Sequence, residues 1–325
     1  MTKFTAFILA VLLFLAGFAG CAPADSDDGR LRVVTTNFAL YDFARAVCGD
    51  LAEVTMLISP GSESHDFEAS LADIAAIAGA DLFVSVGSED WVDDIFTAIG
   101  EEGADVNRIT AMEHCEVYGA SCELPGHDDH AHSHEDHDHG EHEDHDHERE
   151  ELDEHVWTSI HNALTLLDVI AVRMSEIDSA NAAAYLAQKQ AYADALTALD
   201  EEFHGMTESA ARRTIVVADR FPFLYLADDY GLTWHAAFLG CSSDTEPSLA
   251  AINTLIETVK HENIPAVFVI EFSDARTAGA VAYETGADIL TIQSAHNVTR
   301  EEFKSGVTYL DLMRQNLEAL RTALN

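Results

Sequence analysis

The chain has 325 residues, 48% of them apolar, and its 58 acidic and 17 basic side chains give a formal net charge of −41 at pH 7. This length is sufficient for two lobes, each with its own core. Such an acidic chain is unsuited to nucleic acids, which need a basic groove, and it favours a cationic ligand.

The N-terminus indicates export. The apolar stretch from Phe4 to Gly20 is too short for a convincing membrane span and is typical of a secretory signal. Its end, Phe18-Ala19-Gly20-Cys21, resembles a bacterial lipoprotein cleavage box. We therefore expect residues 1–20 to be a signal peptide, Cys21 to carry the lipid that anchors the protein to the membrane, and residues 21–30 to form a tether. The alternative is an ordinary secretory peptide in which Cys21 is incidental.

From Leu31 the sequence alternates between short apolar strands and amphipathic helices. The predicted strands are Leu31–Thr35, Ala52–Ser59, Asp81–Gly87 and Asp105–Met112, and the predicted helices are Leu40–Leu51, Leu71–Ala80 and Trp91–Ile99. This alternation predicts a parallel sheet flanked by helices. We expect residues 31–178 to form this N-terminal α/β lobe.

A segment rich in His, Asp and Glu, residues 123–152, interrupts the first lobe. Neutral imidazole is a ligand for Zn, Cu, Fe and Ni, and neighbouring carboxylates raise the local cation concentration. Because residues 127–147 carry no apolar side chain larger than that of Ala131, we expect a disordered loop that binds several metal ions weakly. Its nine histidines, the auxiliary low-affinity ligands, are His127, His130, His132, His134, His137, His139, His142, His145 and His147.

Four cysteines remain after Cys21. An even number in an exported protein permits disulfides, and two of them are close enough in sequence to close a short loop ahead of the histidine run. Spacing alone does not fix the pairing among Cys48, Cys115, Cys122 and Cys241.

Two long helices are predicted next, over His155–Ile177 and Ala180–Met206, the second with Ser179 as its N-cap. The second helix is rich in alanine and contains no glycine before Gly205. At 1.5 Å per residue it would extend roughly 40 Å, enough to cross between two lobes. We expect residues 179–207 to form a rigid bridging helix.

Residues 208–325 are predicted to form a second α/β lobe. The predicted strands are Thr214–Asp219, Leu232–Phe238, Pro265–Glu271 and Ala287–Ile292, and the predicted helices are Phe223–Asp229, Leu249–Asn263, Thr277–Thr285 and Arg300–Leu324. The fold class is therefore α/β, with two lobes that are each a mostly parallel sheet flanked by helices. Ligands of such sheets bind beyond the carboxyl ends of the strands, so we expect the metal site in the cleft between the lobes.

Three histidines outside the loop lie where such a cleft would form. His65 is in the loop after the second strand, His155 begins a helix, and His296 follows the last strand. Three imidazoles with one oxygen donor or water make a tetrahedral zinc site, and Asp66 or Asp153 is close enough in sequence to orient a histidine ring.

The layout resembles the metal-specific solute-binding proteins of ABC transporters, the family of bacterial zinc-uptake and manganese-uptake lipoproteins. The similar motifs are Pro60-Gly61…His65-Asp66-Phe67, Asp153-Glu154-His155-Val156-Trp157, Phe268-Val269-Ile270-Glu271, and a terminal helix with Tyr309…Met313…Asn316-Leu317. A His-rich insert just before the second motif resembles the zinc branch. The resemblance implies two α/β lobes bridged by a long helix, a membrane permease and a cytoplasmic ATPase as partners, and His65 and His155 as the first two ligands.

Two positions depart from the family pattern. In the family that this chain resembles, the third ligand lies five residues before a tyrosine. Counting back five residues from Tyr225 gives Arg220. Arginine does not ligate a cation. The usual carboxylate near the last strand has no clean match either, so His296 is the replacement, with Asp219 or water as the fourth ligand.

We expect a monomeric receptor outside the cytoplasm that captures Zn²⁺ for an importer and has no catalytic activity. The sequence has no HExxH helix and no G-x-S-x-G motif, which argues against a zinc hydrolase. A Mn²⁺ receptor is less favoured, because manganese sites use more oxygen ligands. The other alternative is an extracellular metal buffer or adhesin.

Overall fold

The first half of the chain folds around a parallel sheet whose strand order is β2-β1-β3-β4. The strands are β1 (Leu31–Thr35), β2 (Ala52–Met56), β3 (Leu82–Ser85) and β4 (Asn107–Thr110), and the helices are α2 (Phe38–Cys48), α3 (Leu71–Ala78) and α4 (Asp90–Ile99). All four residues of β3 are buried, as expected for a central parallel strand covered on both faces. Short 3₁₀ turns follow α2, α4 and β4.

This computed structural model describes residues 29–62, 67–103, 105–119, 152–238 and 247–325. The compact unit runs from Leu31 to Asn325. Cys21, His65, Asp66 and the histidines of the 127–147 run lie outside the described residues.

The second half of the chain folds around another parallel sheet, with strand order β6-β5-β7-β8. Its strands are β5 (Thr214–Val217), β6 (Thr233–Ala236), β7 (Ala266–Ile270) and β8 (Asp288–Ile292). The helices are α7 (Leu224–Asp229), α8 (Leu249–Glu262), α9 (Arg276–Thr285), α10 (Arg300–Ser305) and α11 (Tyr309–Leu324). The α/β class with two sheets is confirmed.

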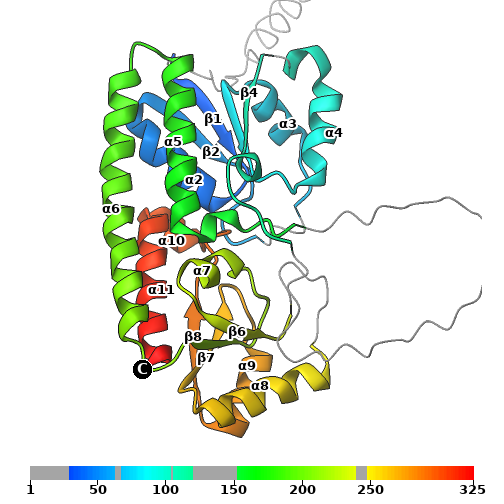
Figure 1. The fold of residues 1–325 in the computed structure, drawn as a ribbon. Helices are drawn as coiled ribbons and strands as arrows, with labels where there is room; N and C mark the ends of the chain where they lie inside the picture. Colours follow the sequence, from blue (N-terminus) through cyan, green and yellow to red (C-terminus); the bar gives the residue numbers. More distant parts are fainter. Residues whose placement is uncertain (1–28, 63–66, 104, 120–151, 239–246) are drawn as a thin grey trace, which may run out of the picture. The chain divides into compact units, whose positions relative to one another are not determined.

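Two long helices, α5 (Ile160–Ile177) and α6 (Ala182–Ser209), connect the two sheets along the chain. The first part of helix α6 packs against α5 and α2, and its last part packs against α11 (Figure 1). Arg321 of α11 forms an ion pair with Glu202 of α6 at 3.9 Å. These contacts agree with a bridging position for α6, while its rigidity and the domain boundaries stay predictions.

The structure corrects two predicted helix starts and divides one predicted helix in two. Helix α5 begins at Ile160 rather than His155, because residues 156–158 form a 3₁₀ turn and the Ser159 side chain caps the helix. Helix α6 begins at Ala182 after Asn181, so Ser179 is not its cap. The single C-terminal helix is two helices, separated at Gly306, whose φ of 78° is a left-handed conformation that favours glycine.

Asp42 connects three helices from distant parts of the chain. Its buried carboxylate accepts hydrogen bonds from Tyr192 Oη of α6 at 2.5 Å, from the backbone N–H of Tyr309 of α11 at 2.8 Å, and from Arg45 of its own helix α2 at 2.7 Å. A buried carboxylate needs such partners, because leaving it unpaired costs several kcal/mol. This contact therefore ties helices of both halves to α6.

Cys48 and Cys115 both carry free thiols, while Cys122 and Cys241 lie outside the described residues. The possible pairing of Cys115 with Cys122 therefore falls partly outside the described residues and stays a prediction. Burial raises the pKa of each described thiol to about 12, so both stay protonated at neutral pH.

Candidate metal centre

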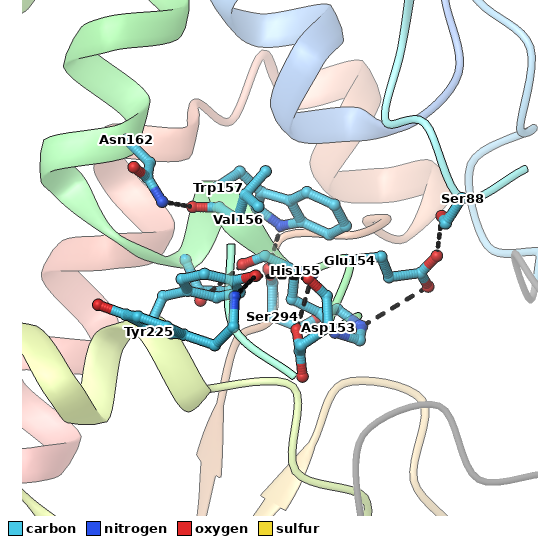
Figure 2. A network of polar contacts seen from close by, with 11 residues as sticks. Ser88, Asp153, Glu154, His155, Val156, Trp157, Asn162, Tyr225 and Ser294 are labelled. Atoms are coloured by element: carbon cyan, nitrogen blue, oxygen red, sulfur yellow. Dashed lines mark hydrogen bonds and ion pairs between the residues drawn. The ribbon is translucent and has the colours of Figure 1, made fainter. Parts of the chain in front are cut away.

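His155 is held in one orientation by Asp153. The Oδ1 atom of Asp153 accepts the backbone N–H of His155 at 2.9 Å and lies 3.0 Å from its Nδ1 (Figure 2). Because an ionised carboxylate only accepts hydrogen bonds, this contact places the ring proton on Nδ1 and leaves the Nε2 lone pair available for a metal. The expected role of Asp153 as a partner of a histidine ring agrees with this geometry.

Glu154 is a further candidate ligand, which the sequence analysis did not name. Its Oε1 atom lies 4.0 Å from His155 Nε2, and its other oxygen contacts the hydroxyl of Ser88, which follows β3 (Figure 2). In the sequence, only its position next to His155 indicated Glu154 as a ligand. Adjacent residues do not by themselves direct their side chains to the same point.

His296 is presented by a turn that follows β8. Its backbone carbonyl accepts the N–H of Phe38, the first residue of α2, at 2.9 Å. The preceding residue, Ala295, is fully buried and has a φ of 58°, a left-handed conformation that costs a non-glycine residue of order 1–3 kcal/mol. The surrounding contacts maintain this backbone conformation. The conformation turns the chain after β8 and so places His296.

Trp157 connects the two histidine segments. Its indole N–H donates to the carbonyl of Ser294 at 2.8 Å, and its ring centroid is 5.1 Å from that of His296. The rings of His155 and His296 are 5.9 Å apart in an edge-to-face arrangement. The indole therefore fixes the distance between two segments that are far apart in sequence.

Glu271, which follows β7, supports the same turn from the second sheet. Its carboxylate accepts the backbone N–H of Ser294 at 2.8 Å and the Ser294 hydroxyl. Burial raises the pKa of the Glu271 carboxyl above its usual value, and the hydrogen bonds from Ser294 offset only part of this effect. Gln293, the residue before Ser294, is held by Asn316 of α11. The Asn316 side chain accepts the backbone N–H of Gln293 and donates to its carbonyl.

Glu154, His155 and His296 together form a group whose ligand atoms all lie within 4.8 Å of one another. His155 is 3% exposed, and the other two are half-buried. Two imidazole nitrogens and a carboxylate oxygen are suited to a divalent transition metal. The structure thus brings together two of the three predicted histidines.

The segment leading to His65 is tied to the turn that carries His296. Asn297 donates to the carbonyls of Ser59 at 2.9 Å and Ser62 at 2.8 Å, and the N–H of Gly61 donates to the carbonyl of Val298 at 2.8 Å. The loop after β2 therefore begins beside His296.

The stem of the 120–151 segment adjoins the same site. Gly119 and Leu152 form an antiparallel bridge, and the N–H of Asp153 donates to the carbonyl of Tyr118 at 2.9 Å. The Tyr225 hydroxyl donates to the Asp153 carbonyl at 2.5 Å (Figure 2). Both ends of this segment are therefore anchored next to His155.

Residues 33–323 match the family model described as "Zinc-uptake complex component A periplasmic". The chain belongs to this family. It is 32% identical over 304 residues to the zinc-binding lipoprotein AdcA of Streptococcus pneumoniae, covering 93% of this chain and 57% of that protein. The chain thus spans little more than half the length of the first such relatives. It is 31% identical to the high-affinity zinc uptake system protein ZnuA of Bacillus subtilis, covering 98% of this chain and 96% of that one.

Solved structures of the family share this fold. The Zn(II)-bound ZnuA-like domain of Streptococcus pneumoniae AdcA has a TM-score of 0.71 at 29% identity, covering 91% of this chain and 99% of that domain. The laminin-binding adhesin Lmb of Streptococcus agalactiae, in a mutant form, has a TM-score of 0.72 at 26% identity, covering 91% of this chain and all of that one. Among the described residues, no helix is long and apolar enough to cross a membrane.

Arg220, the position that the resemblance assigns to a third ligand, lies with Asp219 at a cavity outside the group of Glu154, His155 and His296. Asp219 and Arg220 line a cavity of about 460 Å³ beside Asp274 and Arg276. The Asp219 carboxylate accepts the N–H of Arg220 at 2.9 Å and contacts the Ser273 hydroxyl. Asp219 is not in the group formed by Glu154, His155 and His296. Among the described residues, Glu154 is therefore the carboxylate that lies with His155 and His296, and the fourth-ligand role of Asp219 or water stays a prediction.

Proposed function

We propose that this chain is a lipid-anchored receptor outside the cytoplasm, attached through Cys21, that captures one Zn²⁺ ion as a monomer and delivers it to an ABC importer. The group formed by Glu154, His155 and His296 carries the proposal. Membership of a zinc-uptake family supports it. The family consists of transport receptors, and the proposed activity involves no catalytic step.

His65 is the proposed fourth ligand. Ser62 is hydrogen-bonded to Asn297, the residue next to His296, and His65 is only three positions after Ser62 in the sequence. Three residues of extended chain span at most about 10 Å, so His65 is constrained to follow the turn that carries His296 closely. Three nitrogens and one carboxylate make a tetrahedral set that favours Zn²⁺ over Mn²⁺, which prefers more oxygen ligands.

The test uses a shortened chain in which a Gly-Ser turn replaces residues 121–150. The Gly119–Leu152 bridge holds the two ends together, so the replacement closes without rearranging the rest. We expect the shortened chain to bind one Zn²⁺ tightly, as measured by calorimetry with a competing chelator. Elemental analysis of the full chain as purified identifies the metal it retains.

Single substitutions then test each ligand. We expect His65→Ala, His155→Ala, His296→Ala and Glu154→Gln each to weaken binding at least tenfold, since even the partners of metal ligands contribute about that much. The exposed His261 on α8 supplies the control, and His261→Ala is expected to leave the affinity unchanged. Unchanged affinity in the His296→Ala variant would remove that residue from the ligand set.

A second candidate function is a metal buffer or adhesin, which the likeness to the adhesin Lmb favours. In a buffer, the histidines of the 127–147 run bind the metal ions, and the two lobes only support this run. The shortened chain separates the two functions, because a receptor retains its single tight site whereas a buffer loses its capacity.

A further inference from the structure

Tyr225, the second residue of α7, is a buried side chain to which the proposed function gives no role. It is 2% exposed, and its ring stacks on that of Tyr118, with the ring centroids 5.0 Å apart. Burial raises the pKa of its hydroxyl, which therefore keeps its proton at neutral pH. Because a buried hydroxyl needs hydrogen-bond partners, the groups that it contacts show what it holds in place.

The Tyr225 hydroxyl bridges the two segments that flank residues 120–151. It accepts the backbone N–H of Tyr118 at 3.2 Å and donates its own proton to the carbonyl of Asp153 at 2.5 Å (Figure 2). The N–H of Asp153 in turn donates to the carbonyl of Tyr118 at 2.9 Å. Both backbone polar groups of Asp153 are therefore held by tyrosines.

This bridge lies directly behind the candidate ligand His155. The carboxylate of Asp153 accepts the backbone N–H of His155 at 2.9 Å and lies 3.0 Å from its ring Nδ1. A rotation of the Asp153 backbone would move this carboxylate, and the imidazole would follow it. The hydroxyl of Tyr225 therefore acts on His155 through Asp153.

Tyr118 links the same segment to α7 at a second point. Its hydroxyl donates to the carboxylate of Asp228, near the end of α7, at 2.9 Å. With the ring stack and the bridge at Tyr225, this contact fastens Tyr118 along the helix. A helix from the second half of the chain thus sets the backbone next to His155.

We propose that Tyr225 is a positioning residue for zinc binding, whose hydroxyl fixes the backbone of Asp153 and so sets the orientation of His155. This inference rests on the proposed function, because it concerns the same metal site. The alternative is that Tyr225 only stabilises the fold through its ring. The two explanations differ at the hydroxyl, since Tyr225→Phe keeps the ring but removes the donor to the Asp153 carbonyl.

Tyr230, at the end of the same helix, supplies a matched control. It is also 2% exposed, its ring stacks on Phe203 with the centroids 4.7 Å apart, and its hydroxyl donates to Asp200 at 2.8 Å. Tyr230→Phe therefore removes one buried hydroxyl whose acceptor is Asp200 rather than Asp153. Denaturant unfolding measures the stability that each variant loses.

Zinc affinity of the full chain is measured by calorimetry, with a competing chelator that binds Zn²⁺ more tightly than the histidine run does. We expect Tyr225→Phe to weaken binding about tenfold, at the lower end of the losses found for groups that orient metal ligands. Tyr230→Phe should bind Zn²⁺ within twofold of the unchanged chain. An affinity within twofold for Tyr225→Phe, or equal losses in the two variants, would overturn the proposal.

Amide hydrogen exchange of the metal-free full chain, followed by NMR, tests the positioning without zinc. We expect Tyr225→Phe to speed exchange at Asp153 and His155 roughly tenfold or more, because both amides depend on the bridged segment. Exchange at Phe38, whose N–H donates to the His296 carbonyl, should not change, and Tyr230→Phe should change none of the three. Unchanged exchange at Asp153 and His155 would refute the positioning role. Failure of the unchanged chain to bind Zn²⁺ would refute the proposed function instead, and the exchange rates would still decide whether Tyr225 positions His155.

Discussion

Removing the carboxylate of Asp153 tests how the candidate site orients its metal ligand. Its Oδ1 atom accepts two hydrogen bonds from His155, from the backbone N–H at 2.9 Å and from the ring Nδ1 at 3.0 Å. His155 is only 3% exposed, so the variant Asp153→Ala removes a buried acceptor that two donors of His155 share. At about 1–3 kcal/mol for each donor that loses this acceptor, the free energy of unfolding should fall by roughly 2–6 kcal/mol.

The same variant should weaken zinc binding. Loss of the group that orients a metal-bound histidine typically costs about 10- to 100-fold in affinity, which corresponds to roughly 1.4–2.7 kcal/mol. Asp153→Asn retains an oxygen acceptor without the charge, so we expect an intermediate loss. Calorimetry of the shortened chain measures the affinity, and denaturant unfolding measures the stability.

A matched control is Asp168→Ala, which removes an exposed carboxylate paired with Lys189 at 2.9 Å on the helices α5 and α6. Exposed pairs contribute about 0–1 kcal/mol, so neither quantity should change much. If Asp153→Ala binds zinc within twofold of the unchanged chain, the orienting role of Asp153 is refuted.

Three further outcomes are expected. Asp42→Ala should lower the free energy of unfolding by about 3–5 kcal/mol, because it leaves buried partners on α6 and α11 unpaired; a loss below about 1 kcal/mol in denaturant unfolding would contradict this. Imidazoles protonate near pH 6.5, so metal held by the 127–147 run should be released as the pH falls through about 6. Metal titration of the full and shortened chains should therefore give different stoichiometries above about pH 6 and the same stoichiometry below it. Finally, α6 contains no proline and only Gly205 near its end, so solution scattering of the shortened chain should show little change in radius of gyration on zinc loading; a large decrease would indicate a hinge.

The order of strands and helices was predictable from the sequence, because it depends on local patterns. Apolar runs such as Leu82–Ser85 and the spacing of apolar residues in Tyr309–Leu324 distinguish strand from helix without knowledge of the rest of the fold. The alternation of these elements then implies a parallel sheet. The ends of helices were less predictable, since contacts from elsewhere decide them. The indole of Trp157, held by the carbonyl of Ser294, belongs to a 3₁₀ turn where the sequence favoured continuous helix.

The candidate metal site was only half visible in the sequence. His155 and His296 were identifiable by their places at the ends of predicted elements, and a resemblance to a known family strengthened the choice of His155. The closeness of Glu154 to both, and the support that Glu271 gives through Ser294, depend on how the carboxyl edges of the two sheets meet. No local pattern encodes that meeting, because it depends on contacts between segments far apart in sequence, such as those that Asp42 of α2 makes with α6 and α11. The sequence by itself therefore determined the two-sheet fold and indicated imidazole ligands, and the tertiary structure decided which side chains lie together in one candidate group.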